Sequence, residues 1–205
     1  YKTIADAPPS GICGSGLLDC LANLTRSGVI DRTGNFQKGI NSDRLRKTDN
    51  SYEFVLGDRS ITSTKRDIVI TQADIQNLMR SKAAIYSAIS TLLESMGMSV
   101  NNIEQLYLAG GFGNYLDIRS AITIGMLPDV SASKVQFVGN TSVIGAKMAL
   151  LAKDAYEIAG ILASKMTYFD LMSNNKYMEE YMSANFLPHT DIEKFPSVAQ
   201  ELMVS

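Results

Sequence analysis

The sequence predicts an α/β protein, and two patterns carry that prediction. Short apolar runs of the kind that form buried strands alternate with longer segments whose apolar residues recur at helical spacing. Two glycine-rich turns, at residues 11–16 and 110–113, each stand directly before a predicted helix. With 205 residues and 45% apolar residues, the chain can bury a sizeable core. We therefore expect residues 1–205 to form one α/β domain.

The first fifty residues predict a single helix. Residues 1–4 have the apolar character of a strand end, and two prolines then interrupt the chain before the glycine turn GICGSG. Residues 15–27 place their leucines on one helical face, and Gly28 stands where a C-terminal glycine stop belongs. The polar segment 31–50 has no sustained period, so we expect a loop or a variable insertion there.

The next part of the chain predicts two strands and the longest helix. Residues 52–56 and 68–70 are short apolar runs typical of strands. Thr71 and Asp74 have the spacing of a capping box, in which each residue bonds to the backbone of the other. A helix with regularly spaced apolar residues follows and ends at Gly97. We expect it to pack across a sheet.

Strands and helices continue to alternate to the end of the chain. We predict strands at residues 106–109, 135–138 and 167–171, and helices at 117–124, from 139 onward, at 154–165 and within 174–189. Asp117 is placed to cap its helix and Gly125 to end it. Gly145 and Ala149 lie four residues apart, so a neighbouring element could approach that helix closely.

Composition excludes several classes of protein. The 21 acidic and 19 basic residues give a net charge of −2 without long runs of either sign, so nothing indicates nucleic acid or a membrane surface as a partner. No apolar run reaches about 18 residues, and the N-terminus lacks the pattern of a signal peptide. Two cysteines make no disulfide framework. We expect a cytoplasmic protein and, because the chain opens with Tyr1 instead of methionine, a fragment.

The glycine turns are the candidate binding sites. Glycine lets a ligand approach the backbone closely, as the turn 110–113 would at the end of a strand. In the first turn the amides of Gly14, Ser15 and Gly16 would lie at a helix N-terminus, which attracts anions. Either turn could serve packing alone. Neither GxGxxG nor GxxxxGK[ST] occurs, which disfavours a dinucleotide fold and a P-loop.

Six segments, in the same order, resemble the reductive activators of corrinoid proteins. They are SGICGSGLLD (10–19), ITQADIQNLMRSKAAI (70–85), LYLAGGFGNYLD (106–117), IGMLP (124–128), GNTSVIGAKMALL (139–151) and FLPHTD (186–191). In that family an ATPase domain of the actin, sugar-kinase and heat-shock-chaperone superfamily, with a ribonuclease H-like fold, is joined to an iron-sulfur electron-transfer domain. The resemblance implies that this chain is the C-terminal lobe of such an ATPase domain.

The resemblance also implies a function and binding residues. The parent protein would use ATP to return the Co(II) corrinoid protein of a methyltransferase system to Co(I), with that corrinoid protein as partner and a homodimer as a possible assembly. Lys82 would reach a ribose or phosphate oxygen, and the helix after residue 139 would connect the two lobes. Four residues of the LAGGFG segment would pass beneath the ribose and adenine: Gly110, Gly111, Phe112 and Gly113.

The chain departs from the family pattern in two respects. The DxGT turns that hold the phosphates and Mg²⁺ are missing, because residues 31–34 are DRTG and Asp58 is followed by RS. An iron-sulfur cluster needs about four thiolates, and two cysteines cannot supply them. We therefore expect no cluster in this chain and no ATPase activity of the isolated chain. A lobe of a small-molecule kinase and a non-catalytic binding module remain alternatives, which upstream cysteine spacing or DxGT turns would distinguish.

Single reactive residues give weaker predictions. Cys13 has the position of a thiol with a lowered pKa at a helix start, but a small buried residue in a tight turn is the favoured interpretation. Cys20 falls beside an apolar helix face and is expected in the core. His189 has no neighbouring histidine or cysteine in the sequence, so we predict no metal site and a solvent-facing or capping role for it.

Overall fold

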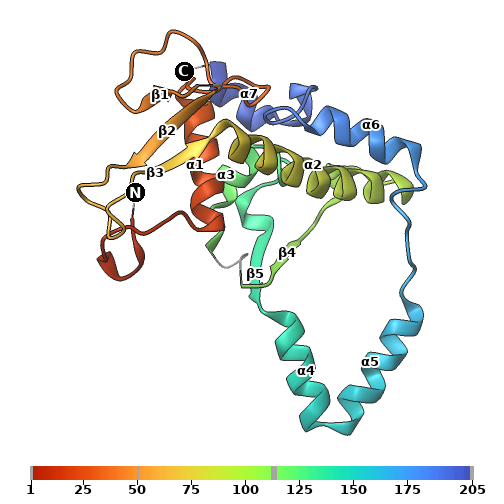
Figure 1. Cartoon of the computed structure of the whole chain (residues 1–205). Helices are drawn as coiled ribbons and strands as arrows, with labels where there is room; N and C mark the ends of the chain where they lie inside the picture. The colour runs from red at the N-terminus through yellow and green to blue at the C-terminus, as the bar shows by residue number, and fades with distance from the viewer. Residues whose placement is uncertain (1, 50, 112–114, 204–205) are drawn as a thin grey trace.

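The computed structural model describes residues 2–49, 51–111 and 115–203 (Figure 1). Phe112 and Gly113 of the predicted adenosine turn lie outside these ranges. The α-helices are α1 (Gly14–Arg26), α2 (Gln72–Ser95), α3 (Ile118–Thr123), α4 (Thr141–Leu151), α5 (Lys153–Lys165), α6 (Asn175–Ala184) and α7 (Pro196–Met203). The strands are β1 (Leu45–Lys47), β2 (Tyr52–Gly57), β3 (Ile68–Thr71), β4 (Leu106–Ala109) and β5 (Val135–Gly139).

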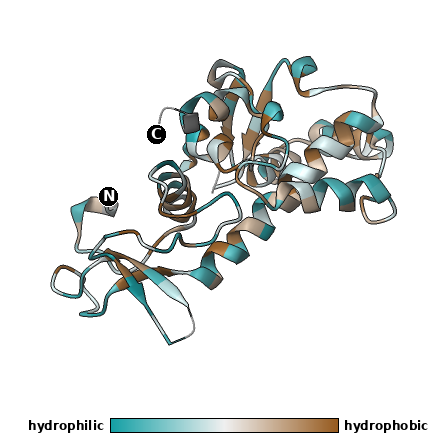
Figure 2. Ribbon diagram, turned by 90° about the horizontal axis from the view of Figure 1, so that it is seen from above, coloured by the Kyte–Doolittle hydropathy of each residue, from teal (hydrophilic) through white to brown (hydrophobic). Residues whose placement is uncertain are grey.

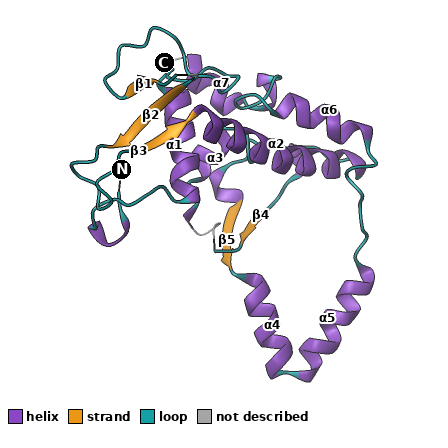
Figure 3. Ribbon diagram, viewed as in Figure 1, coloured by secondary structure: helices purple, strands orange, loops and turns teal. Residues whose placement is uncertain are grey.

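The described strands form two small sheets (Figure 3). β1, β2 and β3 form an antiparallel sheet in that order, with an irregularity in register between Val55 and Gly57. β4 and β5 pair in parallel, with Leu106 opposite Val135 and Ala109 opposite Gly139. A parallel pair requires a crossover between its strands, and here the crossover contains α3.

Local signals set the limits of α2. The Thr71 hydroxyl accepts a hydrogen bond from the Asp74 amide, and the Asp74 carboxylate accepts one from the Thr71 amide, so the predicted capping box is confirmed. The helix ends before Gly97, whose φ of +66° favours glycine. α2 lies beside α6 (Figure 1), and its packing across a sheet stays a prediction.

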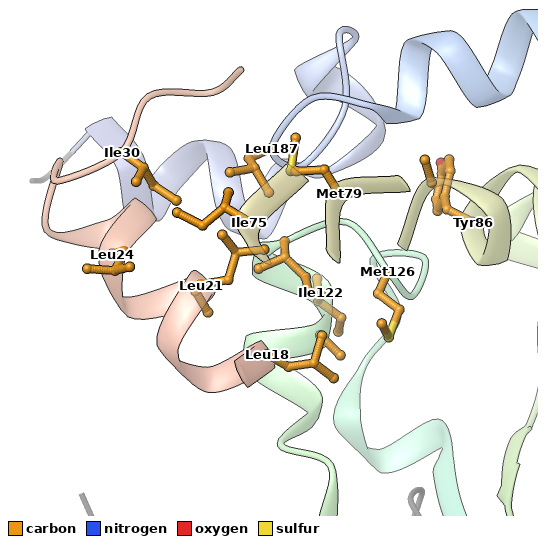
Figure 4. Close-up of a cluster of buried hydrophobic side chains, with 14 of the residues drawn as sticks. Leu18, Leu21, Leu24, Ile30, Ile75, Met79, Tyr86, Ile122, Met126 and Leu187 are labelled. Atoms are coloured by element: carbon orange, nitrogen blue, oxygen red, sulfur yellow. The ribbon is translucent and has the colours of Figure 1, made fainter. Parts of the chain in front are cut away.

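The hydrophobic core lies where α1, α2 and α3 meet. Figure 4 shows side chains from these helices pointing toward one another, with Leu187 from the C-terminal region among them. Leu21, Ile75 and Leu187 have no exposed surface. The leucines of α1 therefore do occupy the face that their spacing predicts.

The hairpin formed by α4 and α5 stands away from this core (Figure 1). None of its residues is buried, although many are apolar, as their hydropathy colours show (Figure 2). Its large apolar side chains with at least half of their surface exposed are Val143, Ile144, Met148, Leu150, Leu151, Tyr156, Ile158, Ile161 and Leu162. Gly145 and Ala149 lie on the same face of α4, and a Cβ atom on Gly145 meets nothing within 4 Å.

Three predicted elements differ from the structure. The strand expected at residues 167–171 does not form, because no neighbouring strand lies beside that segment to pair with it. The strand end expected at residues 1–4 is replaced by a 3-10 turn at Ile4–Asp6. The segment 31–50 was expected to be a loop, but it contains β1, which pairs with β2. Helix α7 was not predicted.

Candidate functional site

Two glycines at the ends of the parallel strands, Gly110 after β4 and Gly139 at the end of β5, lie side by side. The Gly110 amide donates a hydrogen bond to the Gly139 carbonyl at 2.8 Å, which extends the parallel pairing beyond β4. Both residues have positive φ, +97° and +70°, so both need glycine. α4 begins two residues later at Thr141. In open α/β folds, ligands bind outside the carboxyl ends of parallel strands, which is where these turns are.

Gly111 is placed to leave room for a ligand. A Cβ atom built on Gly111 meets no other atom within 4 Å, and the same holds for Gly110. Unlike Gly110, Gly111 has no positive φ, so conformation does not require glycine there. Packing within this chain does not require it either. Open space above the backbone is what a ribose or adenine ring would need at this position.

The other predicted turn forms the first turn of α1. The Cys13 thiol accepts a hydrogen bond from the Gly16 amide at 3.4 Å and lies 3.4 Å from the Ser15 hydroxyl. These two interactions, the Ser15 bond first, lower the pKa of Cys13. Cys13 is exposed, so the expectation of a buried cysteine was wrong. The Gly16 amide is engaged by this thiol, and Gly14 is the first helical residue.

The directions of α1 and α3 bring the turn before α1 and the turn at Gly110 and Gly111 to one side of the domain. Arg26, the last residue of α1, donates a hydrogen bond at 2.7 Å to Thr123, the last residue of α3. Because the C-terminal ends of the helices meet and both run upward in Figure 1, they start on the same side. Asp117 caps α3 by accepting from the Ser120 amide at 2.6 Å, as predicted.

Lys82 does not face these turns. Its side chain has no exposed surface, and its Nζ donates to the carbonyl of Pro188 at 2.8 Å and to that of Phe186. Burial lowers the pKa of Lys82 to about 7. Its predicted contact with a ribose or phosphate oxygen stays a prediction, and the geometry of this chain gives it no support.

His189 lies in the interior, so of its two predicted roles, solvent-facing or capping, the solvent-facing one was wrong, whereas its ring does accept a hydrogen bond from a backbone amide. Its exposure is 2%, its Nδ1 accepts from the Asp191 amide at 3.0 Å, and its Nε2 is 3.5 Å from a carboxylate oxygen of Glu180. The ring packs between Tyr86 and Phe195. Glu180, which contacts both His189 and Lys194, was not identified as a candidate from the sequence.

Two further properties concern metals and membranes. In the parts of the chain that the structure describes, no three His, Cys, Asp or Glu side chains gather as metal ligands would. Cys20 is half-buried, and burial raises the pKa of its thiol to about 11. Among the described helices, none combines the length and the apolar character needed to cross a membrane.

Comparison with known proteins identifies relatives along nearly the whole chain. Residues 1–199 match the family model described as the C-terminal domain of RACo, the ASKHA domain. The chain is 34% identical over 192 residues to the corrinoid activation enzyme RamQ of Eubacterium limosum, covering 89% of this chain and 32% of the relative. It is 27% identical over 176 residues to the Co(II) methylated amine-specific corrinoid protein reductase of Methanosarcina barkeri, covering 83% and 28%.

A solved structure shows the same fold. The structure of a reductive activator for corrinoid, iron-sulfur protein superposes with a TM-score of 0.91 at 47% identity, covering 97% of this chain and 32% of that one. The chain therefore spans about a third of the length of these relatives. The predicted α/β fold class and the resemblance to corrinoid activators are confirmed. The chain belongs to the family of the C-terminal ASKHA domain of RACo, the reductive activators of corrinoid proteins.

Proposed function

We propose that this chain is the nucleotide-binding portion of an ATP-dependent activator that returns the Co(II) form of a corrinoid protein to Co(I). Family membership supports the actin-like ATPase fold, and the names of the relatives support a corrinoid protein as the partner. Reduction to Co(I) is uphill for ordinary cellular donors, so ATP would supply the free energy through a conformational change. The methyl donor that is served is outside this proposal.

The observation that carries the nucleotide assignment is the pairing of Gly110 with Gly139. It places two glycine turns together at the carboxyl ends of parallel strands, with open space at Gly111. A nucleotide fits this surface because backbone without side chains admits a flat ring at van der Waals distance. The phosphates and Mg²⁺ would be held by DxGT turns, which this sequence lacks.

An iron-sulfur cluster does not fit the cysteines of this chain. Cys13 is exposed at the start of α1, whereas Cys20 is half-buried farther along the same helix. Together they supply two thiolates, and a cluster requires about four. We therefore place the cluster of the proposed activator outside these 205 residues.

The substitution Gly111→Val tests the nucleotide assignment in the complete protein that carries this sequence. A valine side chain would fill the open space, and we expect the affinity for ATP to fall at least about tenfold, which is roughly 1.4 kcal/mol. Gly160→Val is the matched control, because Gly160 also lacks positive φ and has open space but lies on the exposed helix α5. Calorimetric titration with ATP measures both.

The two variants separate binding from folding. Circular dichroism and thermal melting must first show that both are folded, since a strained turn lowers stability by a comparable amount. Unchanged ATP affinity in a folded Gly111→Val protein would mean that the glycines serve packing. The corrinoid step is tested by following the visible spectrum of a Co(II) corrinoid protein mixed with the complete protein and a low-potential reductant. ATP-independent conversion to Co(I) would contradict the proposal.

A further inference from the structure

Residues 186–191, FLPHTD, form a segment that the candidate nucleotide site does not use. We call this segment the strap. Leu187, Pro188 and His189 are buried, and Phe186 is half-buried. The strap follows α6 and lies against α2, far from the glycine turns in the sequence. Its side chains at Leu187 and His189 are buried, and its backbone carbonyls also make hydrogen bonds with other parts of the chain.

Two cationic side chains hold the strap by its carbonyl groups. Lys82 of α2 donates to the carbonyls of residues 186 and 188. Arg32, which follows α1, donates to those of residues 187, 189 and 190, with its Nε 3.1 Å from the first of them. Five successive carbonyls therefore accept hydrogen bonds from these two side chains.

Backbone amides complete the closure. The Leu187 amide donates to the Arg32 carbonyl at 2.8 Å, and the Thr190 amide donates to the Ser183 carbonyl at 3.0 Å. A buried carbonyl that loses its donor incurs a desolvation penalty, and a hydrogen bond from the charged guanidinium of Arg32 is stronger than one from a neutral donor. The closed position of the strap therefore depends on Lys82 and Arg32 as well as on the buried side chains of Leu187 and His189.

The strap also touches the end of α3. A Cβ atom on Gly125 would lie 2.0 Å from the Pro188 carbonyl oxygen, so strap backbone rests directly on this glycine. Gly125 follows the C-cap of α3, a helix of six residues and about 9 Å that begins just after the candidate nucleotide turn. A displaced strap would free one end of a short, stiff element whose other end adjoins the turn.

We propose that Lys82 and Arg32 are positioning residues that close the strap over Gly125 and thereby fix α3 and the glycine turn at Gly110 and Gly111. Closure of the strap is a property of this chain by itself. Only the last step, that the positioned turn binds nucleotide, rests on the proposed function.

Hydrogen exchange measured by mass spectrometry tests the closure. Lys82→Met keeps the aliphatic stem but removes the hydrogen-bond donor. Arg32→Lys keeps the positive charge but removes the guanidinium group, which donates to several carbonyls at once. Lys153→Met is the control, because the Lys153 ammonium lies 3.8 Å from the Glu157 carboxylate on the exposed helix α5 and far from the strap in the sequence. We call Lys82 and Arg32 the clamp. In both clamp variants, but not in the control, we expect the amides of Leu187 and Thr190 to exchange at least about tenfold faster.

The positioning role predicts a second change in the same exchange measurement. Exchange must also rise in peptides from residues 106–111 and 118–127, whereas α1 keeps its protection. Unchanged exchange in the strap would overturn the clamp, and a uniform rise over the whole chain would show global destabilisation instead. Gly97→Ala, which perturbs a distant helix end, gives the pattern of a general loss of stability for comparison.

ATP titration of the complete protein tests whether the strap affects the candidate nucleotide site. Lys82→Met and Arg32→Lys should weaken ATP binding by at least about threefold, whereas Lys153→Met should leave it unchanged. Unchanged affinity in clamp variants with an open strap would overturn the positioning role. If the wild-type protein binds no ATP, the proposed function fails, and the exchange data still decide whether the clamp exists.

Discussion

Gly125→Ala is the substitution whose effect the structure predicts in most detail. Gly125 has a φ of +72°, and a Cβ atom there would lie 2.0, 2.7 and 2.9 Å from three backbone atoms of Pro188. Contacts under 3.0 Å are essentially never made by real Cβ atoms. The obstacle is backbone, so no side-chain rotation can relieve it.

The expected loss of stability has two parts. An alanine in the left-handed region costs roughly 1 kcal/mol. The Pro188 carbonyl must also move from 2.0 Å to at least 3.0 Å, which would break its 2.8 Å hydrogen bond with Lys82. Overpacking and a buried group without its partner each cost roughly 1–3 kcal/mol. We therefore expect a total of about 3–7 kcal/mol.

Gly97→Ala isolates the first part. Gly97 also ends a helix with positive φ, +66°, but a Cβ atom there meets nothing within 4 Å. It should lose only about 1 kcal/mol. Urea unfolding followed by circular dichroism measures both, and an m-value near 2–3 kcal/mol/M would separate the two midpoints by about 1 M or more. Equal midpoints would refute the argument that strap backbone rests on Gly125.

Two further predictions concern pH. Burial by itself would raise the pKa of Glu180, but His189, Lys194 and Ser90 outweigh it and lower the pKa to about 2 from 4.5. The stability from ionised Glu180 is therefore present above pH 4.5 and is lost as pH falls through 2. Glu180→Gln should cost roughly 2 kcal/mol at pH 7 and only about a quarter of that at pH 2.5 in urea unfolding. An equal cost at both pH values would contradict this. Burial lowers the pKa of Lys82 from 10.5 to about 7, so between these values the unfolded chain binds the extra proton and stability rises with pH. The stability of wild type relative to Lys82→Met should rise by about 2–3 kcal/mol between pH 7 and 9.5, and parallel pH curves would show that Lys82 does not titrate there.

The features that the sequence predicts well are those decided within a few residues. The capping box of Thr71 and Asp74, the cap at Asp117 and the glycine stops at Gly28 and Gly97 all have their predicted geometry. Such signals depend on backbone groups one helical turn away, so no distant partner can override them. The family resemblance was confirmed for the same reason, because its glycine segments are contiguous in the sequence.

The features that the sequence predicts poorly depend on distant partners. β1 has one apolar and two basic residues, and its strand conformation comes from pairing with β2. Residues 167–171 pair with no strand among the residues that the structure describes. Exposure also depends on partners: Tyr107 and Phe137 of the parallel pair are 62% and 42% exposed, and no residue of the apolar helix α4 is buried in this chain.

Lys82 shows how far the sequence alone can identify a buried lysine. Ile75, Met79 and Tyr86 of α2 face the core at intervals of four and seven residues, and Lys82 falls on the same stripe. A lysine on an apolar stripe is either close to an edge, where its end reaches water, or buried with specific acceptors. The sequence shows the stripe but not the acceptors, because the carbonyls that receive its hydrogen bonds lie more than one hundred residues away. Periodicity therefore identifies Lys82 as a residue that needs partners, and only the fold of the strap supplies them.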